Sequence, residues 1–194
     1  MIVNDESLAE DRTSFAISTL FRDPMLLAVP SSVPEAMVEK ALQKGAKPLL
    51  LDPALTRYVE IDANVPMRPV SDAWYRAHLP FATPAFSAMT YAAAIDMVSE
   101  GLATAHTPLS LLPSLPANVL SRLRVYTLPG MDRTIVLAMP KHLMTLPGYA
   151  NIFRRLTEFC RNEYGRNVPA EDVLDLPGMP PVRPARLETG IAAA

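Results

Sequence analysis

The sequence predicts an α/β fold in which short strands alternate with helices. Short apolar runs recur along the 194-residue chain, and prolines bound most of them. The 20 prolines are about twice the usual share of ~5%, and because proline lacks a backbone N–H it marks the ends of strands and helices. Helical patterns lie between these runs, and the order strand, helix, strand implies parallel pairing in an α/β sandwich.

The first elements are expected before residue 52. A strand over 21–29 (FRDPMLLAV) is followed by a helix over 34–44, with Ser32 as its cap and Gly45 after its last residue. The run 48–51 (PLLL) is too short for a helix, so we expect a strand that is buried on both faces.

The middle of the chain continues the alternation. A short helix is expected over 72–77, and 79–86 is a strand candidate broken by proline. Ser87 is expected to cap an alanine-rich helix that runs to Glu100, because alanine is the best helix former. A buried strand is then predicted over 102–107.

The last elements are a strand over 133–139 and an amphipathic helix over 147–163. The apolar face of this helix is predicted from Ile152, Leu156 and Phe159. From residue 165 to 194 the chain is rich in proline and poor in aromatic residues, so we expect a mostly disordered or loosely docked tail.

Composition and charge exclude several classes of protein. The formal charge is −2, from 18 basic and 20 acidic residues, so no broad positive field attracts nucleic acid or an anionic membrane. Cys160 is the only cysteine, which excludes an internal disulfide and favours the reducing cytoplasm. No apolar run is long enough to cross a membrane, and no export signal follows Met1. We therefore expect a cytoplasmic protein with no membrane partner.

No catalytic pattern is present in the sequence. Glycine-rich phosphate loops, the Gly-x-Ser-x-Gly motif and the His-Glu-x-x-His motif are missing. His78, His106 and His142 are far apart in the sequence and have no paired ligands, so we expect neither a metal site nor a cofactor. The adjacent acidic pairs are typical of solvated surface, which argues against an enzyme.

Four segments resemble the effector-binding domain of LysR-type transcriptional regulators. Residues 20–30 (LFRDPMLLAVP) are similar to that family's crossover strand into its second lobe. Residues 97–108 (MVSEGLATAHTP) resemble its pattern of helix, Gly-Leu-Gly, apolar strand and proline, with Ala103 in place of the second glycine. Residues 133–142 resemble the strand that returns to the first lobe, and the helix after Pro147 resembles the closing helix.

This resemblance implies a two-lobed, periplasmic-binding-protein-like (type 2) fold with an incomplete first lobe. The expected parts are a first-lobe remnant with its crossover strand (1–29), a second lobe (30–134), a return crossover with the closing helix (135–164) and a tail (165–194). The family's helix-turn-helix, linker helix and opening first-lobe elements have no counterpart here. We therefore expect a truncated piece with uncovered apolar surface and reduced stability.

The resemblance also implies a small-molecule effector, held by hydroxyls and backbone amides in the cleft between the lobes. The expected effector-binding residues are Leu51, Asp52, Ala54, Thr56, Phe86, Ser87, Ala88, Thr104, His106 and Thr107. Ser87 and Thr56 can equally be caps or turn residues, and His106 can be a buried histidine with satisfied hydrogen bonds. The expected hinge residues are Val29, Pro30, Ala138 and Met139, which can equally be core-strand residues.

The implied function is effector sensing in a LysR-type regulator. Effector occupancy would change the geometry of a homo-oligomer, a dimer or tetramer, and so alter DNA binding by a helix-turn-helix outside this chain. The helix over 87–100 is a candidate for the dimer interface as well as for the core. A stand-alone solute-binding protein of the same fold is the alternative, and an enzyme built on this scaffold is a third hypothesis.

Overall fold

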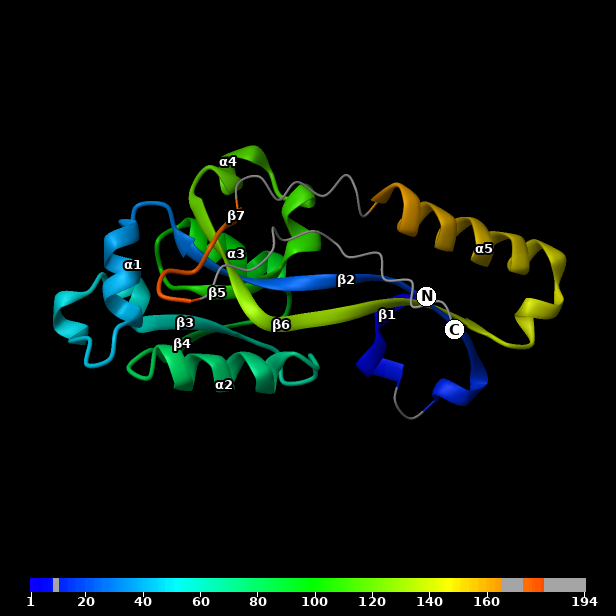
Figure 1. Ribbon diagram of the computed structural model, residues 1–194, viewed down its shortest axis with the longest axis horizontal. Helices are drawn as coiled ribbons and strands as arrows, with labels where there is room; N and C mark the ends of the chain where they lie inside the picture. The colour runs from blue at the N-terminus through cyan, green and yellow to red at the C-terminus, as the bar shows by residue number, and fades with distance from the viewer. Residues whose placement is uncertain (9–10, 165–172, 180–194) are drawn as a thin grey trace. The chain divides into compact units, whose positions relative to one another are not determined.

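The computed structural model describes residues 1–8, 11–164 and 173–179 and divides the chain into two compact units. Unit 1 contains the described parts of 1–24 and 132–164, and unit 2 contains 25–131 and 173–179. Two long strands, β2 (Phe15–Pro30) and β6 (Leu123–Pro140), contribute to both units (Figure 1). Among the described residues, no helix is long and apolar enough to span a membrane.

Unit 1 is built on the first part of β2 and the last part of β6. Strand β1 (Ile2–Asn4) pairs antiparallel with β6, and β6 lies between β1 and β2 in the sheet. A small core forms where Leu8, Val136 and Ala138 pack together with Val3, Phe15 and Ile17. The short 3-10 helices of this unit are η1 (Asp5–Leu8), η2 (Arg12–Ser14) and η6 (Leu143–Thr145).

Helix α5 (Pro147–Asn162) confirms the helix expected over 147–163. One face packs on unit 1, where Cys160 is buried and the Arg161 guanidinium donates to the backbone oxygen of Thr19. The same helix carries an apolar stripe whose side chains are 37 to 52% exposed, formed by Tyr149, Ile152, Leu156 and Phe159. This stripe agrees with the expectation of uncovered apolar surface in the first lobe.

Unit 2 alternates strands and helices, as the sequence predicts. Its helices are α1 (Glu35–Leu42), α2 (Arg68–His78), α3 (Tyr91–Ser99) and α4 (Ala117–Leu120), with the 3-10 helices η3 (Pro48–Leu50), η4 (Pro53–Thr56) and η5 (Leu109–Ser114). Its other strands are β3 (Arg57–Ile61), β4 (Thr83–Ala88), β5 (Ala105–Pro108) and β7 (Val173–Leu174).

Strand pairing in unit 2 is mixed. Strands β3 and β4 are parallel, and the Thr104 backbone extends this pairing, because Val59 N donates to Thr104 O at 2.9 Å. Strand β5 pairs antiparallel with β2, so the expectation of parallel pairing is right for β3 and β4 and wrong for β5 with β2. All side chains from Met25 to Val29 are fully buried, because both faces of this apolar run are covered.

Three local predictions are wrong. Residues 48–51 form no strand: closely spaced prolines leave only a single 3-10 turn, and Leu49 is 99% exposed. Ser32 does not cap α1, since Pro34 precedes that helix without a side-chain cap. Ser87 lies in β4, and the Thr90 hydroxyl caps α3 by accepting a hydrogen bond from Ala93 N at 3.2 Å.

Other local predictions are confirmed. The Gly that follows the alanine-rich helix, Gly101, has a φ of 78°, the left-handed conformation that ends helices. Helix α2 includes the expected helix over 72–77 and extends it at both ends. Strand β2 includes the expected strand over 21–29.

The C-terminal tail is only partly as expected. Strand β7 pairs parallel with β6, and Leu176 is 2% exposed within the core of unit 2. The segment 173–179 is therefore packed, which corrects the expectation of a loose tail there. The rest of the expected tail, 165–172 and 180–194, lies outside the described residues.

Candidate functional site

The candidate site is the end of unit 2 at which parallel strands β3 and β4 finish and helices α2 and α3 begin (Figure 1). We call residues 61–68 and 88–91 the carboxyl edge. The strand pairing continues to its rim, where Asp62 N donates to Ala88 O at 3.0 Å. The first turn of each helix has N–H groups with no partner within the helix, so such an edge suits ligands that accept hydrogen bonds.

The turn after β3 is held by its own side chains. The Asp62 carboxylate accepts hydrogen bonds from the backbone N and the Nδ2 of Asn64, both at 2.8 Å. Val65 N then donates to Asp62 O at 3.0 Å. Because these contacts fix the turn, the start of α2 is positioned relative to the end of β3.

Arg68 joins the first turn of α2 to β3. Its guanidinium donates to Asp72 at 2.8 Å, to the Ile61 backbone oxygen and to Glu60. The hydrogen bond to Asp72 raises the pKa of Arg68, so the side chain stays charged. Two carboxylates already offset this charge, which makes Arg68 a structural clamp at the edge.

The side of the carboxyl edge formed by β4 and α3 is more open. Met89 is 81% exposed, and Ser87 is exposed in the last part of β4. The Thr90 hydroxyl caps the first turn of α3. A ligand at this edge would meet an apolar side chain and the start of a helix.

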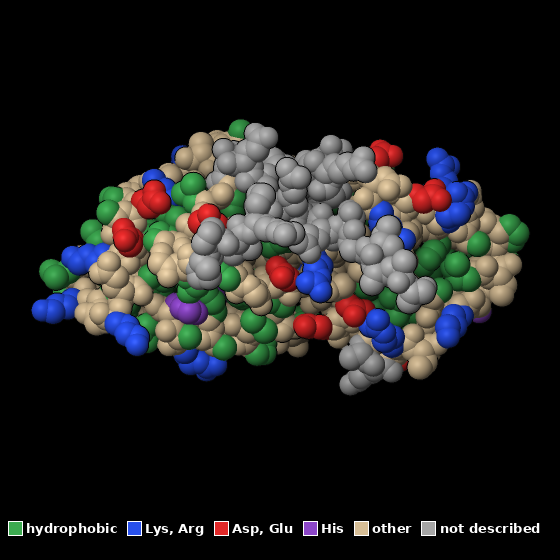
Figure 2. All heavy atoms as spheres, in the orientation of Figure 1, with side chains coloured by type: hydrophobic (Ala, Val, Ile, Leu, Met, Phe, Trp, Pro, Cys, Tyr) green, Lys and Arg blue, Asp and Glu red, His purple; other side chains and the backbone are tan. Residues whose placement is uncertain are grey.

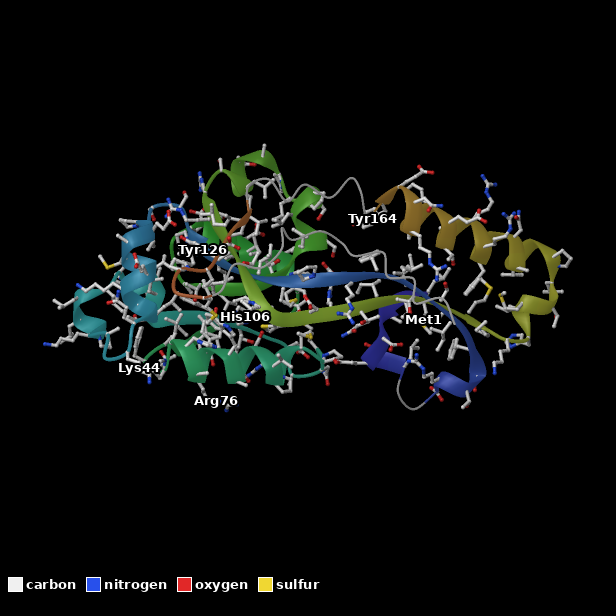
Figure 3. All side chains as sticks on the ribbon, in the orientation of Figure 1. Met1, Lys44, Arg76, His106, Tyr126 and Tyr164 are labelled. Atoms are coloured by element: carbon white, nitrogen blue, oxygen red, sulfur yellow. The ribbon has the colours of Figure 1, made fainter. Side chains whose placement is uncertain are left out.

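A buried polar group lies between α2 and the neighbouring strands. His106 is 2% exposed, and its Nδ1 hydrogen-bonds to the Ser71 hydroxyl at 2.8 Å. Its ring stacks on Tyr75, with centroids 4.5 Å apart, and meets the edge of Trp74 at 4.9 Å. The Tyr75 hydroxyl pairs with the Thr104 hydroxyl at 3.0 Å. Figure 3 shows His106 inside the unit.

Burial keeps these groups uncharged. Burial, and secondarily the charge of His78, lowers the pKa of His106 to about 3, and burial raises the pKa of Tyr75 well above its ordinary value. His106 Nε2 is buried and has no hydrogen-bond partner among the described residues. The sequence expectation of a satisfied histidine is therefore right for Nδ1 and wrong for Nε2.

The described residues contain no group of three or more His, Cys, Asp or Glu side chains placed to hold a metal ion. Cys160 is buried in unit 1, and this burial raises the pKa of its thiol. A protonated thiol is a poor nucleophile.

The structure places the ten expected effector-binding residues in three different regions of unit 2. Those of the first region precede β3, at the amino end of the parallel pair: Leu51, Asp52, Ala54 and Thr56. Those at the end of β4 are Phe86, Ser87 and Ala88. Those buried in or just before β5 are Thr104, His106 and Thr107.

The first region has local structural roles. Asp52 Oδ1 accepts a hydrogen bond from Ala54 N at 2.8 Å, and the Thr56 hydroxyl donates to Pro53 O at 2.8 Å. These are cap and turn contacts, as the alternative interpretation of Thr56 has it. The expected site follows a strand predicted over 48–51, but the strand that pairs with β4 is β3, over Arg57–Ile61. The carboxyl end of the parallel pair therefore lies later in the sequence than expected.

Of the expected residues, Ala88 lies in the carboxyl edge, but sequence reasoning missed its other residues, chiefly Asp62, Arg68 and Thr90. One signal was available in the sequence. The alternating run RYVEI at 57–61 is followed by Asp-Ala-Asn-Val-Pro, a typical turn composition after a strand.

The four expected hinge residues lie inside the units. The division of the chain falls between Pro24 and Met25 and between Met131 and Asp132. Val29 and Pro30 are therefore in unit 2, and Ala138 and Met139 are in unit 1. Next to the second division, Gly130 has a φ of 71°, a conformation that favours glycine.

Solved structures with a similar fold include regulatory and effector-binding domains. The regulatory domain of reduced OxyR2 from Vibrio vulnificus aligns with a TM-score of 0.51 and 17% identity, over 76% of this chain and 64% of that one. The effector-binding domain of QuiR in complex with shikimate aligns with a TM-score of 0.50 and 17% identity, over 76% and 66%. An OxyR mutant from Corynebacterium glutamicum, H2O2-bound, aligns with a TM-score of 0.53 and 14% identity, over 86% and 49%.

No family model and no curated protein matches the sequence. The chain spans about 64% of the length of the OxyR2 regulatory domain. At these identities the likeness concerns the fold. The chain has the type 2 periplasmic-binding-protein-like fold of the effector-binding domains of LysR-type transcriptional regulators.

Proposed function

We propose that this chain is the effector-sensing part of a LysR-type regulator and that the carboxyl edge of unit 2 contributes to its effector site. The observation that carries the proposal is the convergence of the starts of α2 and α3 at the end of a parallel strand pair. Such edges bind small molecules in many α/β proteins, because free N–H groups and helix dipoles face the ligand.

The groups at the edge suit binding rather than catalysis. Asp62 and Arg68 are engaged in contacts that hold the local structure, and His106 is buried and uncharged. Other recognition groups there include backbone N–H groups and the exposed side chains of Ser87 and Met89. We therefore propose a small polar or anionic effector; among the similar structures, QuiR is a complex with shikimate.

In the full-length regulator, effector occupancy would shift the equilibrium between arrangements of the lobes and of a homo-oligomer. A helix-turn-helix outside this chain would bind DNA in the cytoplasm, and this chain would control that binding. The hinge belongs to the same proposal, and we place it where β2 and β6 pass between the units, at 24–25 and 131–132.

A charge change at the edge tests the binding part of the proposal. Met89→Glu places a negative charge near the start of α3 at an 81% exposed position, so folding should be preserved. We expect about tenfold weaker binding of small carboxylates, such as shikimate, in calorimetric titrations. Ile152→Glu is the matched control, because it adds the same charge at a 52% exposed position in unit 1. Equal affinities of the two variants would contradict the proposed site.

The regulatory part has a separate test. The coding sequence upstream of Met1 can be read in frame. A helix-turn-helix and a linker helix there support the regulator, whereas an export signal there would contradict it and favour a solute-binding protein.

A further inference from the structure

A second concave region lies at the other end of α2. This pocket of about 460 Å³ opens between the C-terminal ends of α1 and α2 and the loops that follow them. Its volume is within the usual range for small-molecule sites, roughly 300–1,000 Å³. Since α2 has 11 residues, about 16 Å of helix separate it from the carboxyl edge. The two regions are distinct places in the same unit.

The surroundings of this pocket are positively charged. The segments 40–48 and 76–82 contain Lys40, Lys44, Lys47 and Arg76 and no acidic residue. Lys44 lines the pocket, and all four side chains belong to exposed residues. Basic side chains gather at this end of the unit in Figure 2, and Figure 3 places Lys44 and Arg76 there. Each of the two helix C-termini carries a partial negative charge of about one half, which is smaller than the total charge of these basic residues. A net positive charge therefore remains to attract an anion.

The walls of the pocket are mostly apolar. Phe81 supplies an aromatic surface, and Ala41, Ala46, Ala77, Pro48 and Pro80 supply small or rigid ones. His78 also lines the pocket, and its ring packs on Trp74, with centroids 4.9 Å apart. Burial lowers the pKa of His78, so near neutral pH it presents an uncharged ring rather than a second cation.

We infer that this pocket binds a flat, apolar carboxylate, an aromatic acid in the simplest case. Its ring would pack against Phe81 and His78, and its carboxylate would pair with the Lys44 ammonium. The inference is independent of the proposed effector site, because it uses no residue of the carboxyl edge.

Trp74 provides a direct probe of this site. It is the only tryptophan in the chain and contacts the pocket-lining His78 ring, so its fluorescence should change when the pocket fills. We expect a saturable change with benzoate and at least about tenfold weaker binding of uncharged benzamide, because only benzoate can pair with an ammonium.

Three variants distinguish the pocket from other sources of the signal. Lys44→Gln removes an exposed charge, so folding is preserved, and should weaken benzoate binding about tenfold. Lys141→Gln, at an exposed lysine of unit 1, should leave the affinity unchanged. Equal benzoate affinities of Lys44→Gln and Lys141→Gln, or no saturable change at all, would overturn the inference. A signal lost in Met89→Glu and kept in Lys44→Gln would also overturn it, by assigning benzoate to the carboxyl edge.

Discussion

Acidification should destabilise the protein because the folded chain keeps His106 uncharged. The folded-state pKa is about 3, whereas an unfolded histidine titrates near 6.5. As pH falls below about 6.5, the unfolded chain binds a proton that the folded chain excludes. The stability that this residue confers is therefore complete above pH ~6.5 and is lost progressively towards pH ~3. His78 contributes in the same direction, since its pKa is also lowered by burial.

The size of the effect follows from the linkage relation. Each unit between the solution pH and the unfolded pKa costs about 1.4 kcal/mol. Moving from pH ~7.5 to ~5 should thus lower the free energy of unfolding by about 2 kcal/mol through His106. That is a large part of the stability of a small protein, typically ~5–15 kcal/mol.

Urea unfolding at several pH values measures this effect. His106→Gln keeps a polar side chain near Ser71 and removes the titration, so its stability should depend less on pH than that of the parent chain. The variant will lose stability at every pH, and the comparison is therefore between slopes. His142→Gln is the matched control, because it makes the same substitution at an exposed histidine. Identical pH slopes for His106→Gln and the parent would refute the reasoning.

Two further predictions concern stability. Arg133→Met leaves the fully buried Asp23 carboxylate without the guanidinium that contacts it at 2.7 Å, and should cost about 3–5 kcal/mol in urea unfolding. Arg154→Met is the control: it removes an exposed ion pair with Glu158 and should lower the free energy of unfolding by under about 1 kcal/mol. Similar losses of stability in the two variants would count against a structural role for the buried pair. Leu176→Ala should lower the free energy of unfolding by about 2–5 kcal/mol, because Leu176 lies in the core of unit 2. An unchanged unfolding midpoint would show that segment 173–179 does not pack there in solution.

Local sequence patterns determined the type of several elements. The apolar run around Met25–Val29 could only be a buried strand, and the alanine-rich segment before Gly101 could only be a helix that ends there. Helix α5 was equally predictable from the sequence, because its apolar periodicity and the proline at its start are local signals. These predictions hold because hydrogen bonds within a few residues, together with side-chain period, decide them.

Tertiary structure decided what each element touches. The apolar run at 48–51 resembles a buried strand, yet Leu49 lies in solvent, because β3 takes the place beside β4. His106 forms its hydrogen bond with Ser71, which lies 35 residues earlier in the chain. No pattern in the sequence predicts that pair. Strand partners, burial and the ends of a sheet depend on contacts between distant residues. For this reason the sequence alone predicted the alternation of an α/β fold, and only the folded chain showed where its carboxyl edge lies.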